Sequence, residues 1–485
     1  MELLVPIAVI AGAIWFAIYW KHSSRLDGAV LPVGVAVLLL VQAILGPEFF
    51  SLHAGPIPIT LDRVLLGGLL LVALRKFVTR PAGSHWINWL DMAVLAWIVV
   101  LTASTFLHDF GFRNNLPVTR LLFFNLMPLV LYFVVRQIEW TPGRLDLLQW
   151  CVIGLGAYLA ATGICEWRGW HGLVFPKHII NSPIVEFYGR ARGPLLNPVI
   201  NGMLINAAIA TLLAMAWRKG PTVSLLSAVL IPLMMAGSYA TLTRSVWVGT
   251  ALTTGILILA PLTARARVVV CVSGLALVGL IVGAFGDELN RFKRDRDVSV
   301  EEMAQSAELR PILATVALEM FRDRPVQGFG FGQYSNTKRP YHYLEHDGMP
   351  LTMALPYMQH NVVLSYATET GLLGVVVLIG MLFAGTVLSW QLWRVENNSM
   401  VVRHQSLITL TIVGNYLVNG MFHDVSIVPM CHSHLLLYLG IVSMLTIQWN
   451  QKACMQPAMW TGNLDVEREG SGSVLARPLT RHGSQ

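Results

Sequence analysis

Apolar residues occur in long uninterrupted runs along this chain of 485 residues, with short polar stretches between them. Many runs are long enough for a helix to cross a hydrocarbon layer about 30 Å thick. A helix closes its own backbone hydrogen bonds inside lipid, so the pattern predicts an all-α polytopic membrane protein with about 12–13 transmembrane helices and one long helical loop. The predicted spans are 3–20, 29–46, 59–74, 90–106, 121–135, 145–165, 197–216, 222–240, 246–262, 268–286, 372–393, 405–421 and 431–448.

The composition supports this class of protein. Hydrophobic residues make up 55% of the chain and charged residues only 13%, against about 25% in a typical soluble domain. The formal net charge of +7 does not indicate nucleic-acid binding, because the basic residues fall in short clusters between predicted spans. The five cysteines form no CxxC or zinc-binding spacing, so a disulfide scaffold is not expected.

The loops alternate in charge. Two short loops, 47–58 and 422–430, are poor in Lys and Arg, which places them on the outward face. The opposite set is predicted to be cytoplasmic, with the N-terminus outward and no cleaved signal peptide. That set carries Lys21, Arg25, Arg75, Lys76, Arg80, Arg136, Arg144, Arg218, Lys219, Arg265, Arg267, Arg394 and Arg403.

The chain divides into five predicted parts, two of which are not transmembrane. A long outward loop contains an amphipathic helix that presents one apolar face at i, i+4 spacing and ends at the turn 328–332, Gly-Phe-Gly-Phe-Gly. The apolar face comprises Ile312, Leu313, Val316, Ala317, Met320 and Phe321. The parts are N-terminal transmembrane helices (1–180), transmembrane helices with arginines (181–286), the loop domain (287–361), C-terminal transmembrane helices (362–448) and a flexible cytoplasmic tail (449–485).

Several arginines lie on the outward side, where the positive-inside rule does not explain them. Arg244 occupies a tight turn between two apolar spans, and Arg190 and Arg192 precede the span that starts near Asn197. Arginine at the bilayer centre costs at least roughly 2.5–3.5 kcal/mol on insertion scales, so such residues usually serve a site. Arg63, Arg120 and Arg310 complete the outward set. Arg63 and Arg120 could instead snorkel at helix ends, and Arg310 could be a solvated helix residue.

Guanidinium groups match phosphate oxygens bidentately and keep their charge at any relevant pH. A cluster of them beside lipid indicates an anionic substrate held in the membrane, and a lipid diphosphate fits. His360, at the junction of the loop and the next helix, is the best candidate base, because imidazole titrates near neutral pH. His342 and His346 are weaker candidates, since they lie farther from a predicted membrane helix.

Other patterns carry less weight. The glycines of 328–332 lack the preceding strand and the spacing of a dinucleotide fingerprint. Asp295 and Asp297 have the spacing of a metal site, but a solvated charged stretch explains them better. His432 and His434 point to different helix faces and make a poor metal pair. No metal or cofactor is expected.

At these residues the sequence resembles the O-antigen ligase and O-antigen polymerase family of bacterial envelope glycosyltransferases. Three landmarks match in order over roughly 180–380: an Arg/Gly-Pro segment that runs into Asn-Pro (190–198), a Thr-Arg turn followed by Trp (243–247) and a long loop. The loop carries Arg310 and the Asp-Arg-Pro-Val-Gln-Gly-Phe-Gly stretch (323–330). It closes with His360 and Asn361, followed by Glu-Thr-Gly-Leu-Leu-Gly at 369–374.

The resemblance implies a metal-independent, inverting glycosyltransferase in the bacterial inner membrane, with its active site facing the periplasm. The donor would be an undecaprenyl-diphosphate-linked oligosaccharide, bound through its diphosphate by Arg244 and either Arg190 or Arg192. Arg310 would also contact the diphosphate, with Arg63, Arg120 and Asn361 in support, and His360 would deprotonate the acceptor hydroxyl. Diphosphate is a good leaving group, so catalysis needs mainly charge stabilisation and an activated nucleophile.

Three roles remain open within this resemblance. A polymerase joins one lipid-linked repeat to another in exopolysaccharide, capsule or O-antigen synthesis, and this is the preferred role. A ligase transfers the finished glycan to lipid A-core, and some relatives glycosylate proteins. Membrane lipid and other polysaccharide export proteins are candidate partners.

The alternatives from other classes of protein are a lipid or polysaccharide transporter and a non-catalytic assembly protein. Transporters typically show internal repeats and mid-membrane charges, whereas here the charges gather at the outward rim.

Overall fold

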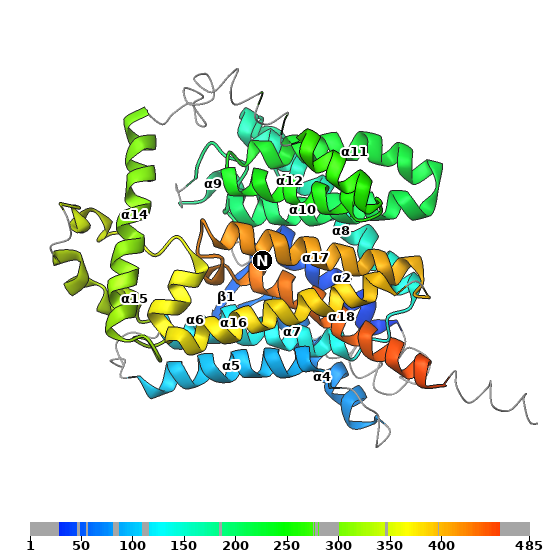
Figure 1. The fold of residues 1–485 in the computed structure, drawn as a ribbon, viewed down its shortest axis with the longest axis horizontal. Coiled ribbons are helices and arrows are strands. Elements are labelled where there is room, and N and C mark those ends of the chain that lie inside the picture. The colour runs from blue at the N-terminus through cyan, green and yellow to red at the C-terminus, as the bar shows by residue number, and fades with distance from the viewer. Residues whose placement is uncertain are drawn as a thin grey trace, which may run out of the picture.

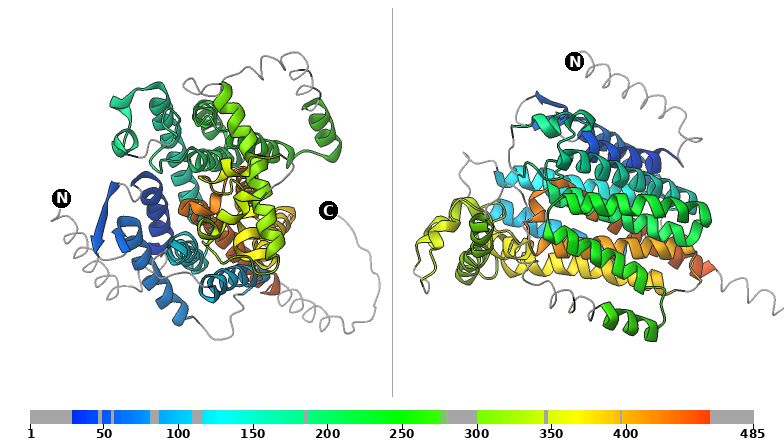
Figure 2. Two further views of the ribbon diagram at one scale, coloured as in Figure 1. Left: turned by 90° about the vertical axis from the view of Figure 1, so that its left-hand side faces the viewer. Right: turned by 90° about the horizontal axis from the view of Figure 1, so that it is seen from above.

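The computed structural model of the protein describes residues 29–45, 49–54, 57–80, 87–108, 116–183, 187–274, 276, 280, 300–344, 348–395 and 397–455. Over these residues the chain is a bundle of helices with a smaller helical domain at one end (Figures 1 and 2). The only sheet in the described part is one antiparallel hairpin, in which Ser51 pairs with Thr60. The predicted all-α class is confirmed.

The helices that precede the loop domain follow the predicted spans closely. They are α2 (Val30–Leu40) with the π-helix η1 (Val41–Leu45), α4 (Leu61–Val78), α5 (Trp89–Leu107), α6 (Leu116–Arg120) continued by η2 (Leu121–Leu126) and α7 (Met127–Arg136), α8 (Pro142–Arg168), α10 (Pro198–Lys219), α11 (Pro221–Ala240) and α12 (Arg244–Leu259). Short turns η3 (His171–Leu173) and α9 (His178–Asn181) lie between α8 and α10, and the hairpin β1 (Ser51–Ala54) and β2 (Ile57–Thr60) precedes α4.

The second half contains the loop domain and three long helices. The loop domain comprises α14 (Val300–Asp323), α15 (Tyr334–Thr337), η4 (Arg339–Tyr343) and η5 (Leu351–Ala354). The bundle is completed by α16 (Val362–Arg394), α17 (Met400–Gly420), the short η6 (Val425–Ile427) and α18 (Pro429–Met455).

Seven helices of the described part are long and apolar enough to cross a membrane: α5, the continuous α6–η2–α7 helix, α8, α10, α11, α16 and α18. Val30–Leu45 and Arg244–Leu259 are shorter apolar helices, and α4 and α17 form helices where spans were predicted. The predicted span 3–20 and most of 275–286 fall outside the described residues. The predicted polytopic membrane class is confirmed, and the predicted number of 12–13 spans stays a prediction.

Four boundaries differ from prediction. The segment 47–58, predicted as a short outward loop, contains most of the β-hairpin. The helix predicted to start at 372 begins ten residues earlier, at Val362. Helix α14 ends at Asp323, before the glycine turn, because Pro325 follows and the residue before a proline disfavours helix. Helix α18 runs to Met455, so the predicted tail starts too early, and its remainder lies outside the described residues.

Small residues let the central helices approach closely. Helices α10 and α18 are the most enclosed of the seven candidate spans, each with 89% of its apolar window buried. A Cβ added at Gly156 of α8 would lie 2.1 Å from the Cβ of Ala208 on α10, and one at Gly202 would meet Val246 of α12 at 2.2 Å. Close backbone packing of this kind drives helix association in lipid, where burying apolar surface gains little.

The loop domain packs around the face predicted for its amphipathic helix. Ile312, Leu313, Val316 and Met320 of α14 are buried against Tyr334 and the η5 turn. Ala317 is also buried, and Phe321 is half-buried. Helix α14 therefore stands across the end of the bundle and packs against α16 (Figure 1).

Candidate functional site

The glycine turn of the loop domain is fixed to α16 by backbone contacts. Gly371 interrupts the helix with φ +63°, and Gly328 has φ +66°, a region that favours glycine. An added Cβ at Gly371 would lie 2.4 Å from the Val326 backbone, and one at Gly328 would lie 2.5 Å from that of Glu369. Four backbone hydrogen bonds between the turn and α16 surround this contact. In two of them the turn donates, from Phe329 N to Thr368 O and from Gly330 N to Glu369 O. In the other two α16 donates, from Leu372 N to Pro325 O and from Leu373 N to Val326 O. Both backbones approach this closely only because the two residues lack side chains.

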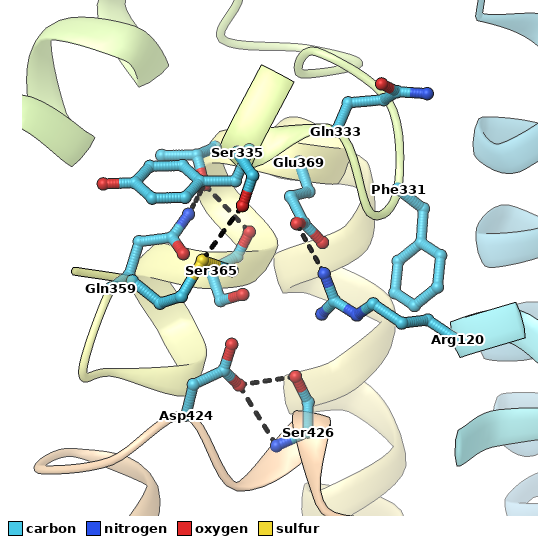
Figure 3. Close-up of polar contacts among 12 residues, drawn as sticks. Arg120, Phe331, Gln333, Ser335, Gln359, Ser365, Glu369, Asp424 and Ser426 are labelled. Atoms are coloured by element: carbon cyan, nitrogen blue, oxygen red, sulfur yellow. Dashed lines mark hydrogen bonds and ion pairs between the residues drawn. The ribbon is translucent and has the colours of Figure 1, made fainter. Parts of the chain in front are cut away.

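A buried ion pair lies beneath this turn. Arg120 Nη1 donates to Glu369 Oε1 at 2.8 Å, and both side chains are at most 4% exposed (Figure 3). The Gly332 N–H also donates to the Glu369 carboxylate, and the Arg120 guanidinium lies 5.0 Å from the centre of the Phe331 ring. Arg120 is thus a buried anchor of the loop domain, and its predicted alternative role at a snorkelling helix end is wrong.

Further buried polar groups surround the ion pair. Gln359 donates through Nε2 to Thr368 Oγ1 at 2.7 Å, and Asp424 accepts from the Ser426 N–H at 3.1 Å. Within the described part, five buried atoms of these residues make no hydrogen bond, namely Arg120 Nε and Nη2, Gln333 Nε2, Gln359 Oε1 and Asp424 Oδ2. The side chains of this cluster gather around the start of α16 (Figure 3). Buried polar atoms without partners are costly, so we expect water or a polar group of a ligand to complete the cluster.

The predicted base lies where the loop domain rejoins the bundle. Asn361 caps α16 by accepting through Oδ1 from the Val363 and Leu364 N–H groups, and its Nδ2 donates to Met421 O at 3.0 Å. The cap fixes the preceding His360, whose exposed ring centre lies 6.5 Å from that of His423. The turn 421–424, which joins α17 to η6, therefore faces the candidate base.

Arg310 lies at the same turn, and Arg244 acts on Arg310 through its charge. The Arg310 guanidinium carbon of α14 lies 5.4 Å from the centre of the Phe422 ring. Burial first, and the nearby Arg244 charge second, lower the pKa of Arg310 from its ordinary value. The positive charge of Arg244 therefore acts unfavourably on the charged form of Arg310. Like charges held together favour an anion between them.

Arg244 begins α12 from a constrained turn. Leu242 has φ +48°, a conformation uncommon for a branched side chain, and Thr241, Leu242 and Thr243 are buried while Arg244 is exposed. The Ala191 N–H donates to Ala240 O at 2.9 Å. This bond places the 190–198 segment beside the Arg244 turn, so two of the sequence landmarks adjoin in space.

The two arginines of the 190–198 segment, Arg190 and Arg192, have different surroundings. Arg192 is fully buried and donates through Nε to Glu166 Oε1 at 3.0 Å, while Glu166 Oε2 also accepts from the Gly193 N–H at 3.0 Å. Arg190 is half-buried, with its guanidinium 5.5 Å from the Phe187 ring centre. The Arg192 charge is neutralised within the protein, whereas Arg190 reaches the surface.

Arg63 lies elsewhere in the bundle. Its guanidinium lies 3.8 Å from the centre of the Phe123 ring and donates to Pro58 O. It lines a pocket of about 200 Å³ with Phe123, Leu196 and Met430. The described contacts of Arg63 are therefore with the hairpin and η2 and not with the 421–424 turn.

A polar cleft opens where α5 meets the loop domain. It has a volume of about 770 Å³, within the usual range of ligand sites. Phe329 and Tyr341 form an edge-to-face pair with ring centres 5.7 Å apart, and Arg324 lies 4.8 Å from the Phe329 ring centre. Gln327 and Asn336 add amide groups to the lining. Aromatic faces beside amides are suited to a sugar-like ligand, which has both apolar and hydroxyl surfaces.

Sequence reasoning missed three residues of this end of the bundle. His423 was overlooked because it follows a predicted span in a short loop without basic residues. Glu369 and Asp424 were not assigned a role, although a carboxylate inside an apolar stretch is itself a signal of a buried partner. The resemblance already contained Glu369 among its landmark residues.

The fold defines a multi-pass helical membrane protein with a helical loop domain at one end of its bundle. Residues 227–379 match the family model described as O-antigen ligase. The match covers the Arg244 turn, the loop domain and the start of α16. The resemblance to the O-antigen ligase and polymerase family is confirmed over this segment. No curated protein matches the chain significantly.

Proposed function

We propose that the protein transfers a glycan from a lipid diphosphate to an acceptor hydroxyl at the periplasmic face of the bacterial inner membrane. The observation that carries the proposal is that Arg310 and His360 lie at the same 421–424 turn, while the charge of Arg244 acts on Arg310. These residues come from α12, the loop domain and the start of α16. A family match to O-antigen ligase supports the same class of reaction.

The cationic end would hold the diphosphate of the donor. Arg244 and Arg310 supply two guanidinium forks, and Arg244 stands at the N-terminus of α12, where backbone N–H groups and the helix dipole also favour an anion. Charge accumulates on the diphosphate as the glycosyl bond breaks, so these groups would stabilise the transition state more than the ground state. Guanidinium groups would perform the task that a metal ion performs elsewhere.

His360 would act as the general base of a single displacement with inversion. The acceptor hydroxyl loses its proton to the His360 imidazole as its oxygen forms a bond to the anomeric carbon of the donor. The bond from that carbon to the diphosphate oxygen breaks, and its electron pair leaves with the lipid diphosphate. The exposure of His360 allows an acceptor to reach it.

The remaining arginines would have separate roles. Arg190, half-buried beside the Arg244 turn, is the proposed diphosphate ligand of the first landmark. Arg192 would instead hold the 190–198 segment through Glu166, because its charge is already paired in a buried site. Arg120 would hold the loop domain through Glu369, and Arg63 would lie outside the diphosphate site.

The cleft between α5 and the loop domain would bind sugar residues of the glycan. Its Phe329 and Tyr341 rings offer apolar surface, and Gln327 and Asn336 offer amide hydrogen bonds. We expect Tyr341→Ala to raise the KM for a long-chain substrate more than for a single repeat, because only a longer glycan would reach beyond the transfer site. An equal rise for both would remove the cleft from the glycan path.

The acceptor we propose is a second lipid-linked repeat unit, which makes the protein a polymerase; transfer to lipid A-core, a ligase reaction, is the alternative. Purified protein in nanodiscs would receive a defined undecaprenyl-diphosphate-linked repeat, with or without a lipid A-core acceptor. Products longer than one repeat in the absence of the core acceptor would support polymerisation. Products formed only with the core acceptor would establish the ligase reaction, and no new glycosidic bond with either acceptor would contradict the proposed function.

A further inference from the structure

A cationic cavity lies at the opposite end of the bundle from the loop domain. It is enclosed by the C-terminal ends of α10 and α16, the N-terminal end of α17 and the segment after α12, and has a volume of about 740 Å³. Figure 1 shows α16 and α17 running from the loop domain to this end. Among the described residues that line it are Arg267, Arg394 and Arg403, and no carboxylate.

Two of these guanidinium groups are fixed in place by backbone carbonyls. Arg403 Nε donates to Trp393 O at 3.0 Å, and its guanidinium carbon lies 4.7 Å from the centre of the Trp393 ring. Arg267 donates to Leu259 O and Ala260 O, each at 3.0 Å. A guanidinium group carries five N–H donors, so these bonds orient the forks and use only part of their donor capacity.

A buried histidine completes the wall of the cavity. His404 is 2% exposed, and its ring centre lies 5.7 Å from that of Trp217 and 6.4 Å from that of Trp393. One ring nitrogen is bonded to the Ala214 backbone, whereas Nδ1 is buried without a hydrogen-bond partner in the described part of the chain. The His404 residue lines the cavity, so a bound ligand would lie beside its ring.

The position of the cavity identifies the source of that ligand. The cluster lies at the end of the bundle where the basic loops gather, which the positive-inside rule assigns to the cytoplasm. Trp217 is 40% exposed and Trp390 is 45% exposed at helix ends that line it, and tryptophan favours the depth of lipid headgroups. Basic pockets between transmembrane helices on the cytoplasmic side suit anionic headgroups.

We propose that this cavity binds the headgroup of an anionic phospholipid of the cytoplasmic leaflet. The lipid phosphate would lie between Arg267, Arg394 and Arg403, with its glycerol region near the His404 ring and its acyl chains along the exposed Trp rings. The site is independent of the proposed transfer reaction, because its residues lie at the other end of the bundle from His360. Its role would be to tie the ends of α10, α16 and α17 together in a membrane of suitable charge.

Native mass spectrometry of the full-length purified protein would test this site with phosphatidylglycerol and phosphatidylcholine of identical acyl chains. Wild-type protein should retain one phosphatidylglycerol in preference to phosphatidylcholine, and Arg403→Gln should weaken that preference about fivefold. Arg265→Gln is the matched control, since Arg265 is exposed at the same end but does not line the cavity. Arg403→Lys, which keeps the charge, should retain a large part of the preference.

Three results would overturn the proposal. One is equal retention of the two lipids by the wild-type protein, and another is an equal loss in Arg403→Gln and Arg265→Gln. The third is full competition by soluble glycerol phosphate, which would define a site for soluble anions instead. If Arg403→Gln fails to fold, Arg267→Gln replaces it, with the same expected fivefold weakening.

Discussion

The imidazole rings of His360 and His423 lie 6.5 Å apart and nearly perpendicular, at 78°. One ring ends the loop domain and the other lies in the turn between α17 and η6, so distant parts of the sequence meet at this point. Arg310 reaches the same turn through Phe422, and the charge of Arg244 acts on Arg310. The contact of His360 with His423 therefore holds the proposed base at the turn that Arg310, a proposed diphosphate ligand, also contacts.

Arg244→Lys should lower the transfer rate by about 10²–10³-fold, the usual effect of removing one donor to a developing charge. Lysine supplies a point charge but not the planar fork that matches two phosphate oxygens. Initial rates with a defined lipid-linked donor would measure the effect. Arg168→Lys is the control, because Arg168 is an exposed arginine at the C-terminal end of α8. A rate for Arg244→Lys equal to that of the control would exclude a fork-specific role.

Glu369→Ala should destabilise the protein by about 3–5 kcal/mol, because it leaves the buried Arg120 charge without its partner. The double variant Glu369→Leu with Arg120→Met should recover a large part of that loss, since no charge remains buried. Thermal unfolding in detergent would compare the variants. Additive losses in the double variant would show that the ion pair is not the source of the effect.

Gly371→Ala should separate the loop domain from α16 and abolish transfer, because the new Cβ would collide with the Val326 backbone at a φ of +63°. Gly380→Ala lies on the same helix in open space and should be neutral or slightly stabilising. Limited proteolysis of the loop domain would report its release from α16. Equal protease resistance and activity in the two variants would contradict the interlocked backbone as the anchor.

Transfer should continue in the presence of EDTA, because guanidinium groups are proposed to stabilise the diphosphate charge. Rates would be measured before and after exhaustive chelation, with and without added Mg²⁺. A strict requirement for a divalent cation would direct attention to Asp295 and Asp297, which lie outside the described residues.

The sequence predicted the helical class and the placement of His360 because both depend on local pattern. Long apolar runs form helices in lipid regardless of tertiary detail. The junction at His360 was recognisable from the change between a polar stretch and an apolar helix. The apolar face of α14 followed equally from residue spacing, and Ile312, Leu313, Val316, Ala317 and Met320 are buried as predicted.

Tertiary contacts account for what sequence pattern missed. The start of α16 was predicted ten residues too late because Thr368, Glu369 and Thr370 interrupt the apolar run. These residues are buried, and they are accommodated by Arg120 and by the backbone of the loop domain. Nothing local in the sequence pairs Arg120 with Glu369, or Arg192 with Glu166, because these partners are distant along the chain.

The most direct test of the central claim is the initial rate of glycan transfer by His360→Ala in nanodiscs with a defined undecaprenyl-diphosphate-linked donor. His171→Ala, which removes an exposed imidazole from the η3 turn, is the matched control. We predict a folded His360→Ala protein that still binds the donor but transfers at least about 10²-fold more slowly than the control. Transfer by His360→Ala at the rate of the control would contradict the assignment of His360 as the base.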